Sequence, residues 1–248
     1  MLQYQIIPVT AFQQNCTLLW CDETHEAALI DPGGDIEKLL QAIGKNNLTL
    51  TKLLLTHGHL DHVGGADKLR KRTGCPIIGP HQADAFWLNA LPAQSEMFGF
   101  AHTDVFTPDH WLTETETVSV GNLELQVLHC PGHTPGHVVF YHADSQLAIV
   151  GDVLFNGSIG RTDFPQGNHT DLISAITKKL LPLGDDVLME GELADNYTIG
   201  EPEATDAPAE GEEEEEDSDN LFETDDLFSD LDTAPDAGAK PQDNESNE

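Results

Sequence analysis

The chain lacks several features that mark common classes of protein. It has 11 Lys and Arg residues against 44 acidic ones. Nucleic acids and anionic membranes are bound through basic patches, so we expect neither as a partner. No apolar run approaches the ~20 residues of a membrane span, and residues 1–5 lack the basic segment of a secretory signal. The four cysteines, Cys16, Cys21, Cys75 and Cys130, form no CxxC pair, which predicts a cytoplasmic protein with free thiols.

Acidic residues are concentrated at the C-terminal end. Residues 201–248 contain one basic residue, Lys240, against 20 acidic ones, and so contribute −19 of the formal net charge of −33. Such a segment buries too little apolar surface to offset its conformational entropy. We therefore predict a folded domain over 1–200 and a disordered acidic tail over 201–248. The Leu-Phe pairs at 221–222 and 227–228 leave open a tail partner, which the sequence does not identify.

Strand and helix patterns alternate before the tail. Periodicity predicts strands over 5–9, 16–21, 27–30, 50–55, 76–78, 118–120, 123–128, 138–141, 147–150 and 186–189. It predicts helices over 35–44, 65–72, 81–91 and 170–181, the first of them capped by Asp35. Strands with intervening helices favour a layered α/β or α+β domain.

A dense polar motif follows one predicted strand. The run Thr-His-Gly-His-Leu-Asp-His at 56–62 places three imidazoles and a carboxylate directly after the apolar residues 53–55. Imidazole nitrogen and carboxylate oxygen are the ligands of zinc, iron and manganese. These side chains would be costly to bury without a partner that satisfies them, so we interpret the run as part of a metal site.

Three further polar patches also follow predicted strands, at 31–33, 130–137 and 151–152. Strand ends that converge on one edge are where the sites of open sheets are built. The residues suggest two metals: His57, His59 and His133 for the first, Asp61 and His62 for the second, and Asp152 as a bridge. Two ions ~3.5–4 Å apart share a hydroxide and polarise a carbonyl.

These motifs together resemble the metallo-β-lactamase fold and, within it, the glyoxalase II-like hydrolases. The resemblance rests on Thr-His-x-His-x-Asp-His at 56–62, Gly-His-Thr-Pro-Gly-His at 132–137 and Gly-Asp at 151–152, in the family's order. Asp-Pro-Gly-Gly at 31–34 and the segment 160–167 resemble the short, single-domain bacterial members. The likeness covers residues 1 to about 189, and it implies an α+β fold, an αββα sandwich with the metal site at one edge.

The resemblance also implies an activity. It points to a metal-dependent hydrolase of thioesters similar to hydroxyacylglutathione hydrolase, with zinc as one or two ions and iron or manganese as alternatives. A metal-bound hydroxide would attack the thioester carbonyl, and Asp61 would hold or orient it. Arg161 falls where related enzymes place a basic residue against glutathione, and Asp163 would pair with it. His137 would orient a ligand or its strand.

One element of the family pattern is missing. The family closes its second metal site with a late histidine after the last strand, but the last histidine here is His169. Alignment on Gly191 puts Glu192 in that place, whereas the register of residues 197–200 puts Leu193 there. Glutamate oxygen is an acceptable ligand, so Glu192, or Glu190, is the candidate replacement.

Two other functions stay open. Persulfide (sulfur) dioxygenases of the same fold use one iron on two histidines and a carboxylate, which here would be His57, His133 and Asp152. The missing late histidine also allows a metal-binding pseudoenzyme that serves as an interaction protein. Thioester cleavage without oxygen would favour the hydrolase over both.

Overall fold

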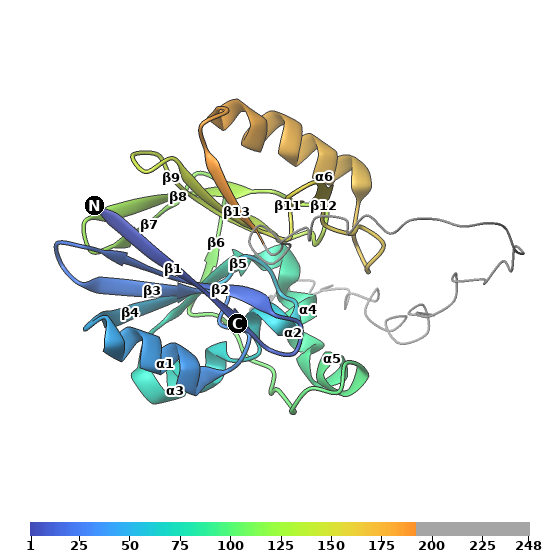
Figure 1. The fold of residues 1–248 in the computed structure, drawn as a ribbon. Helices are drawn as coiled ribbons and strands as arrows, with labels where there is room; N and C mark the ends of the chain where they lie inside the picture. Colours follow the sequence, from blue (N-terminus) through green and yellow to red (C-terminus); the bar gives the residue numbers. More distant parts are fainter. Residues whose placement is uncertain (192–248) are drawn as a thin grey trace, which may run out of the picture. The chain divides into compact units, whose positions relative to one another are not determined.

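The computed structural model describes residues 1–191. The predicted tail 201–248 and the candidate ligand Glu192 lie outside these described residues. Figure 1 shows two sheets stacked face to face with helices on their outer sides. Within residues 1–191, no helix is long and apolar enough to cross a membrane.

The N-terminal half builds a six-stranded sheet. Its strands are β1 (Leu2–Val9), β2 (Gln14–Cys21), β3 (Glu26–Ile30), β4 (Thr49–Leu54), β5 (Ile77–His81) and β6 (His110–Leu112). They lie in the order β1-β2-β3-β4-β5-β6. The first three are antiparallel neighbours, and β3 to β6 pair in parallel. Because β3 and β4 run parallel, the polar segments that follow them lie at the same edge of the sheet.

The second sheet has five strands, in the order β13-β10-β9-β8-β7. These are β7 (Thr117–Val120), β8 (Leu123–His129), β9 (Val138–His142), β10 (Leu147–Gly151) and β13 (Leu188–Gly191). A short ribbon of β11 (Leu154–Phe155) and β12 (Ser158–Ile159) follows β10. Strand β13 pairs in parallel with β10, which places the end of the described chain beside the loop that carries Asp152.

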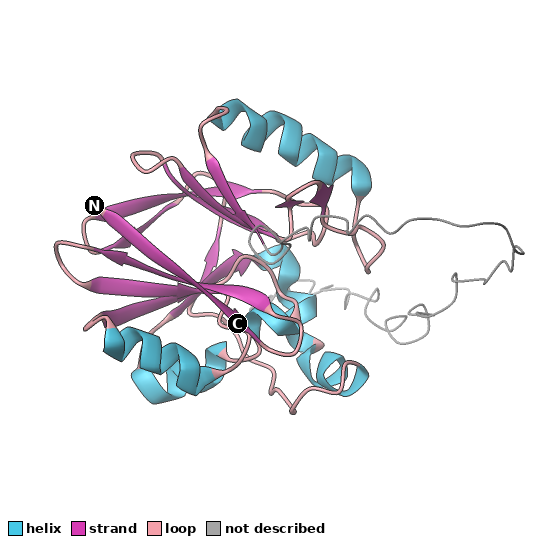
Figure 2. Cartoon of the chain, viewed as in Figure 1, coloured by secondary structure: helices cyan, strands magenta, loops and turns pink. Residues whose placement is uncertain are grey.

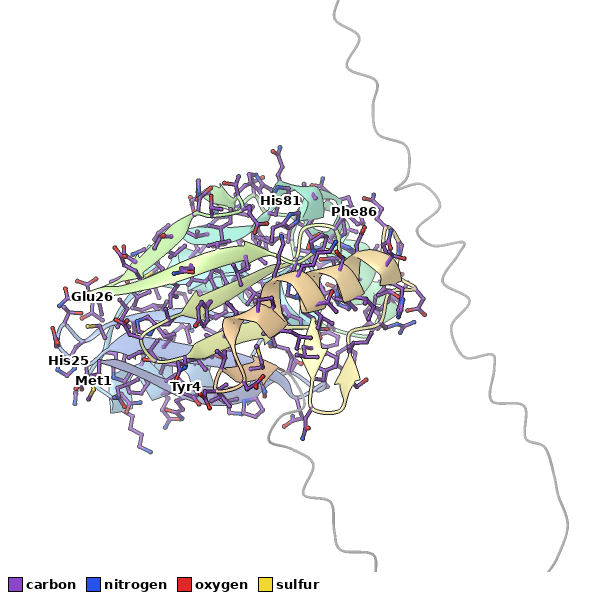
Figure 3. The ribbon with its side chains drawn as sticks, turned by 90° about the horizontal axis from the view of Figure 1, so that it is seen from above. Met1, Tyr4, His25, Glu26, His81 and Phe86 are labelled. Atoms are coloured by element: carbon purple, nitrogen blue, oxygen red, sulfur yellow. The ribbon has the colours of Figure 1, made fainter. Side chains whose placement is uncertain are left out.

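Helices cover the outer faces of both sheets (Figure 2). The helices are α1 (Ile36–Lys45), α2 (Leu60–Val63), α3 (Ala66–Thr73), α4 (Ala85–Asn89), α5 (Leu91–Met97) and α6 (His169–Ala175), the last continued by a π-helical turn over Ile176–Leu180. In Figure 3, seen from above, α6 crosses the outer face of the second sheet. The architecture is the αββα sandwich that the sequence predicts.

Three apolar clusters hold these layers together. One joins the six-stranded sheet to α1 and α3 through residues such as Leu29, Leu39 and Leu69. The second lies between the sheets and includes Leu19 and Phe140. The third packs α6 and the turn after it against the second sheet. Strands β3, β9 and β10 are buried on both faces and read as almost continuous apolar runs, whereas β7 and β8 alternate buried and exposed residues.

Two local expectations are wrong. Asp35 occupies the N-cap position of α1, but it makes no side-chain capping bond, and its Oδ2 accepts the backbone N–H of Thr10 instead, at 3.1 Å. The helix predicted over 81–91 is interrupted, because β5 extends to His81 and a 3-10 turn over Gln82–Asp84 precedes α4. This interruption places Asp84 in the interior.

Candidate metal centre

The predicted metal ligands lie on loops at one edge of the sandwich. His57 and His59 follow β4, His133 follows β8, and Asp152 follows β10. In Figure 3, Glu26, which begins β3, lies at the left margin, and His81, which ends β5, lies well to the right of it. The candidate ligands on the loop after β4 lie beyond the carboxyl ends of the parallel strands.

Four side chains converge on one point. His57 Nε2 and His133 Nε2 each lie 3.0 Å from His59 Nδ1, and Asp152 Oδ2 lies 3.2 Å from His133 Nε2. A ligand atom from each of these four residues lies within 4.8 Å of the others. The structure thus brings together the three histidines and the carboxylate that the sequence assigns to the first metal and its bridge.

Hydrogen bonds on the far side of the rings fix which nitrogen faces the centre. His133 Nδ1 lies 2.8 Å from the carbonyl oxygen of Arg161, which only accepts, so this nitrogen carries the proton. Thr56 Oγ1 donates to Asp31 Oδ2 at 2.5 Å and therefore accepts from His57 Nδ1 at 3.0 Å. The Nε2 lone pairs of His57 and His133 consequently both point at His59.

A second group of side chains adjoins the first. Asp31, His57 and His62 form another set with ligand atoms within 4.8 Å of one another. His62 Nδ1 lies 2.9 Å from Asp31 Oδ2, and its Nε2 lies 3.3 Å from Asp152 Oδ1 and 3.7 Å from Asp61 Oδ2. The two oxygens of Asp152 thus face His62 on one side and His133 on the other, which is the disposition of a bridging carboxylate.

Burial sets the protonation of these groups. It lowers the pKa values of His57 and His59 well below the ordinary histidine value, and neighbouring imidazoles act in the same direction. Burial also opposes the charging of His62, but Asp152 and Asp61 outweigh it and raise the pKa of that imidazole well above its ordinary value. For Asp152, burial opposes ionisation, yet His62 and His133 lower the pKa of its carboxyl. The first set therefore combines the neutral imidazoles of His57 and His59 with the ionised carboxylate of Asp152. The imidazole of His62 is instead protonated between its acidic neighbours and must lose that proton to bind a metal.

The donor set fits a divalent cation. A proton on His59 Nδ1 can satisfy only one of the two lone pairs aimed at it, whereas a cation between the rings satisfies all three nitrogens. Ligand atoms at 2.0–2.1 Å from a tetrahedral ion are about 3.3 Å apart. The observed 3.0 Å separations need only a slight outward movement to reach that value. Neutral imidazole and ionised carboxylate are also the protonation states that metal binding requires.

Other predicted residues have defined places around this centre. His137 stacks on His57 at a ring separation of 4.7 Å, and its Nε2 accepts the backbone N–H of Asp152 at 3.1 Å. Arg161 donates from Nε and Nη2 to the two carboxylate oxygens of Asp163, each at 2.6 Å. The expected pair of Arg161 and Asp163 is therefore formed, and the guanidinium is engaged within the loop that also orients His133.

Of the two candidate replacements for the late histidine, the structure describes only Glu190. Glu192 lies outside the described residues. Glu190 is buried on β13, and its Oε2 accepts a hydrogen bond from Thr17 Oγ1 at 2.9 Å. A small cavity behind His62 is lined by Glu190, Asp31 and Gln14 among others. Glu190 is not among the side chains whose ligand atoms converge on either metal set in residues 1–191.

The sequence analysis did not identify two residues that hold the candidate metal ligands or their loops in place. Asp31 belongs to a recognised strand-end patch, but its contact with His62 and its link to His57 through Thr56 depend on the parallel pairing of β3 with β4. Asp84 belongs to no motif, although its carboxylate bonds to both metal-binding loops. Aromatic rings also enclose His59, with Trp87 at 4.4 Å and Phe164 at 4.9 Å between ring centroids.

Known proteins share this sequence pattern and fold. The chain is 49% identical to hydroxyacylglutathione hydrolase GloC of Haemophilus influenzae over 201 residues, which cover 81% of this chain and 94% of that protein. The BLEG-1 B3 metallo-beta-lactamase structure superposes with a TM-score of 0.71 at 36% identity, over 77% of this chain and 91% of that one. The di-iron-bound structure of TTHA1623 gives 0.69 at 32% identity, over 76% and 91%.

The family model of the metallo-beta-lactamase superfamily matches residues 9–189, which include every candidate ligand except Glu190 and Glu192. The fold, the edge location of the centre and the relatives agree with the resemblance seen in the sequence. The chain belongs to the metallo-beta-lactamase superfamily.

Proposed function

We propose that this metallo-hydrolase cleaves thioesters of the hydroxyacylglutathione type. The observation that carries the proposal is the convergence of His57, His59, His133 and Asp152, with His62 and Asp61 beside them. The similarity to GloC, a hydroxyacylglutathione hydrolase, supports glutathione as the thiol part of the substrate. The buried free thiols of all four cysteines are consistent with a cytoplasmic setting.

The first metal would be held by His57, His59 and His133, and the second by Asp61 and His62, with Asp152 between them. When bound, such ions lower the pKa of a water ligand and polarise the substrate carbonyl. Asp31 orients His62 directly and His57 through Thr56. The side chain of Asp61 is 20% exposed beside His62, so it is placed to accept a hydrogen bond from the attacking water and orient it.

Aromatic rings and one positive charge adjoin the candidate metal ligands. Phe164 packs against both His59 and His133, at 4.9 and 5.9 Å between ring centroids. Trp87 also packs against His59 and contacts Phe164 at 5.9 Å between ring centroids. Arg161, which lies 4.2 Å from the Phe164 ring centroid, carries a positive charge at the edge of this aromatic wall. An anionic glutathione moiety would compete with Asp163 for that guanidinium.

The test is hydrolysis of a hydroxyacylglutathione thioester by the full chain loaded separately with zinc, iron or manganese. Release of free thiol without oxygen uptake is the expected result, and zinc is the expected metal. Oxygen uptake with glutathione persulfide and no thioester cleavage would establish the dioxygenase reaction instead. Absence of turnover with every metal would leave only the interaction protein. Metal content, measured on protein purified without chelator, separates one ion from two and iron from zinc.

A further inference from the structure

The two halves of the first metal site come from different sheets. His57 and His59 lie on the loop after β4 of the six-stranded sheet, whereas His133 lies on the loop after β8 of the five-stranded sheet. The ligand atoms of the two loops must still meet within about 0.2 Å of the required geometry to bind a metal well. Something must therefore fix one loop against the other before the metal arrives.

Asp84 makes that connection. Its carboxylate is fully buried, and its Oδ2 accepts the backbone N–H of Gly58 at 2.9 Å and the hydroxyl of Thr134 at 2.8 Å. Its Oδ1 accepts the backbone N–H of Gly136 at 2.5 Å. Gly58 lies between His57 and His59, and Thr134 directly follows His133. One side chain thus holds both metal-binding loops.

Close packing leaves Asp84 little freedom. A Cβ atom at Gly136 would lie 2.6 Å from Asp84 Oδ1, and one at Gly58 would lie 2.7 Å from Trp87 Cβ. The backbone is fixed as well, because the N–H of His81 donates to the carbonyl of Gly136 at 3.0 Å. The segment of Asp84 is therefore itself bonded to the loop that carries His133, and its carboxylate joins that loop to Gly58 on the other.

We propose that Asp84 is a positioning residue that holds the two metal-binding loops in register and so sets the affinity of the first metal site. The inference rests on the proposed metal centre and adds to it a residue that touches neither metal nor substrate. Three donors, two of them backbone N–H groups on different loops, face this carboxylate. Only a side chain that accepts at both oxygens satisfies them.

The decisive variant is Asp84→Asn, which preserves shape but turns one acceptor into a donor. The amide nitrogen then faces the N–H of either Gly58 or Gly136, so one of the two loops loses its hydrogen bond to residue 84. Loss of a partner outside the ligand shell typically costs 10–100-fold in metal affinity. We expect a loss of about this size, measured by competition between the full apoprotein and a chromophoric chelator.

Variants of Thr134 keep the test independent of whether Asp84→Asn folds. Thr134→Val removes the hydroxyl that donates to Asp84 and is expected to weaken metal binding, whereas Thr134→Ser retains the hydroxyl and is expected to restore wild-type affinity. In the double variant, the effects of Thr134→Val and Asp84→Asn should not add, because both break one network. Asp67→Asn is the control: this carboxylate is ion-paired to Lys71 on α3, so its loss leaves metal affinity unchanged.

Wild-type affinity in Asp84→Asn, or equal weakening by Thr134→Val and Thr134→Ser, would overturn the role of Asp84 while leaving the metal centre standing. Full additivity in the double variant would also overturn it, because the two residues would then act separately. If the wild-type chain binds no zinc, iron or manganese, the proposed function itself fails, and the inference fails with it.

Discussion

Gly33 lies directly against the backbone of the segment that carries Asp61 and His62. A Cβ atom on Gly33 would lie 1.4 Å from the carbonyl oxygen of Asp61 and 2.4 Å from its carbonyl carbon. Both are backbone atoms, so no side-chain rotation relieves the contact. Bringing the closer contact to 3.0 Å requires the two segments to separate by about 1.6 Å, which is several times the ~0.2 Å tolerance of a metal site.

The substitution Gly33→Ala is therefore expected to act on both stability and metal binding. Overpacking of this kind costs about 1–3 kcal/mol in the free energy of unfolding. Displacement of Asp61 and His62 should also lower the affinity for the second metal, which these residues would hold, at least about tenfold. Urea unfolding of the apoprotein measures the first effect, and metal titration followed by elemental analysis measures the second.

Gly44→Ala provides the matched control. Gly44 lies within α1, and a Cβ atom there would meet nothing within 4 Å. Replacement of glycine by alanine inside a helix stabilises it by up to about 1 kcal/mol, and metal binding should not change. If Gly33→Ala matches Gly44→Ala in both measurements, the close approach between Gly33 and the metal-binding segment does not constrain the site, and the reasoning is refuted.

Three further outcomes are expected. Metal at 100 times its Kd should stabilise the chain by about 2.7 kcal/mol, so chelation should lower Tm by roughly 5–10 °C in a scanning experiment; an unchanged Tm would contradict a metal centre. Burial lowers the pKa values of His57, His59 and His137, so at these three side chains the unfolded apoprotein binds more protons below pH 6.5; His62, whose pKa is raised, opposes this only near pH 6.5, because below that it is protonated in both states. The free energy of unfolding of the apoprotein should then fall on acidification by up to about 1.4 kcal/mol per pH unit for each of the three histidines, and a flat urea-unfolding profile between pH 6.5 and 5 would oppose this. Asp163→Asn removes the charge that holds Arg161, so KM should fall for an anionic glutathione thioester but not for a neutral one; equal KM values would exclude Arg161 from substrate binding.

Much of the fold and of the centre could be predicted from the sequence, because the signals are local. Residues 56–62 and 132–137 carry their ligands within short motifs, and apolar runs of strand length mark the layers. The rest depends on tertiary neighbours. Asp84 contacts Gly58 and Thr134, which are 26 and 50 residues away, and nothing in its own segment indicates these contacts.

Tertiary contacts also explain why the predicted cap at Asp35 and the predicted helix over 81–91 are wrong. Asp35 has the residue type of a helix cap, but the turn at residue 10 offers its carboxylate a different donor. The segment 81–91 has helical periodicity, yet parallel pairing of β5 with β6 extends the strand through His81. In both places a tertiary hydrogen bond outweighs a local propensity.

The origin of the ligands on two sheets has a consequence for the order of folding. His59 and His133 are 74 residues apart in the chain, and contacts of such separation form late because loop closure must come first. A cation that needs both side chains finds no site on either sheet alone. In the proposed enzyme, the first metal would then bind only after the two sheets have packed against each other, so metal loading would follow folding.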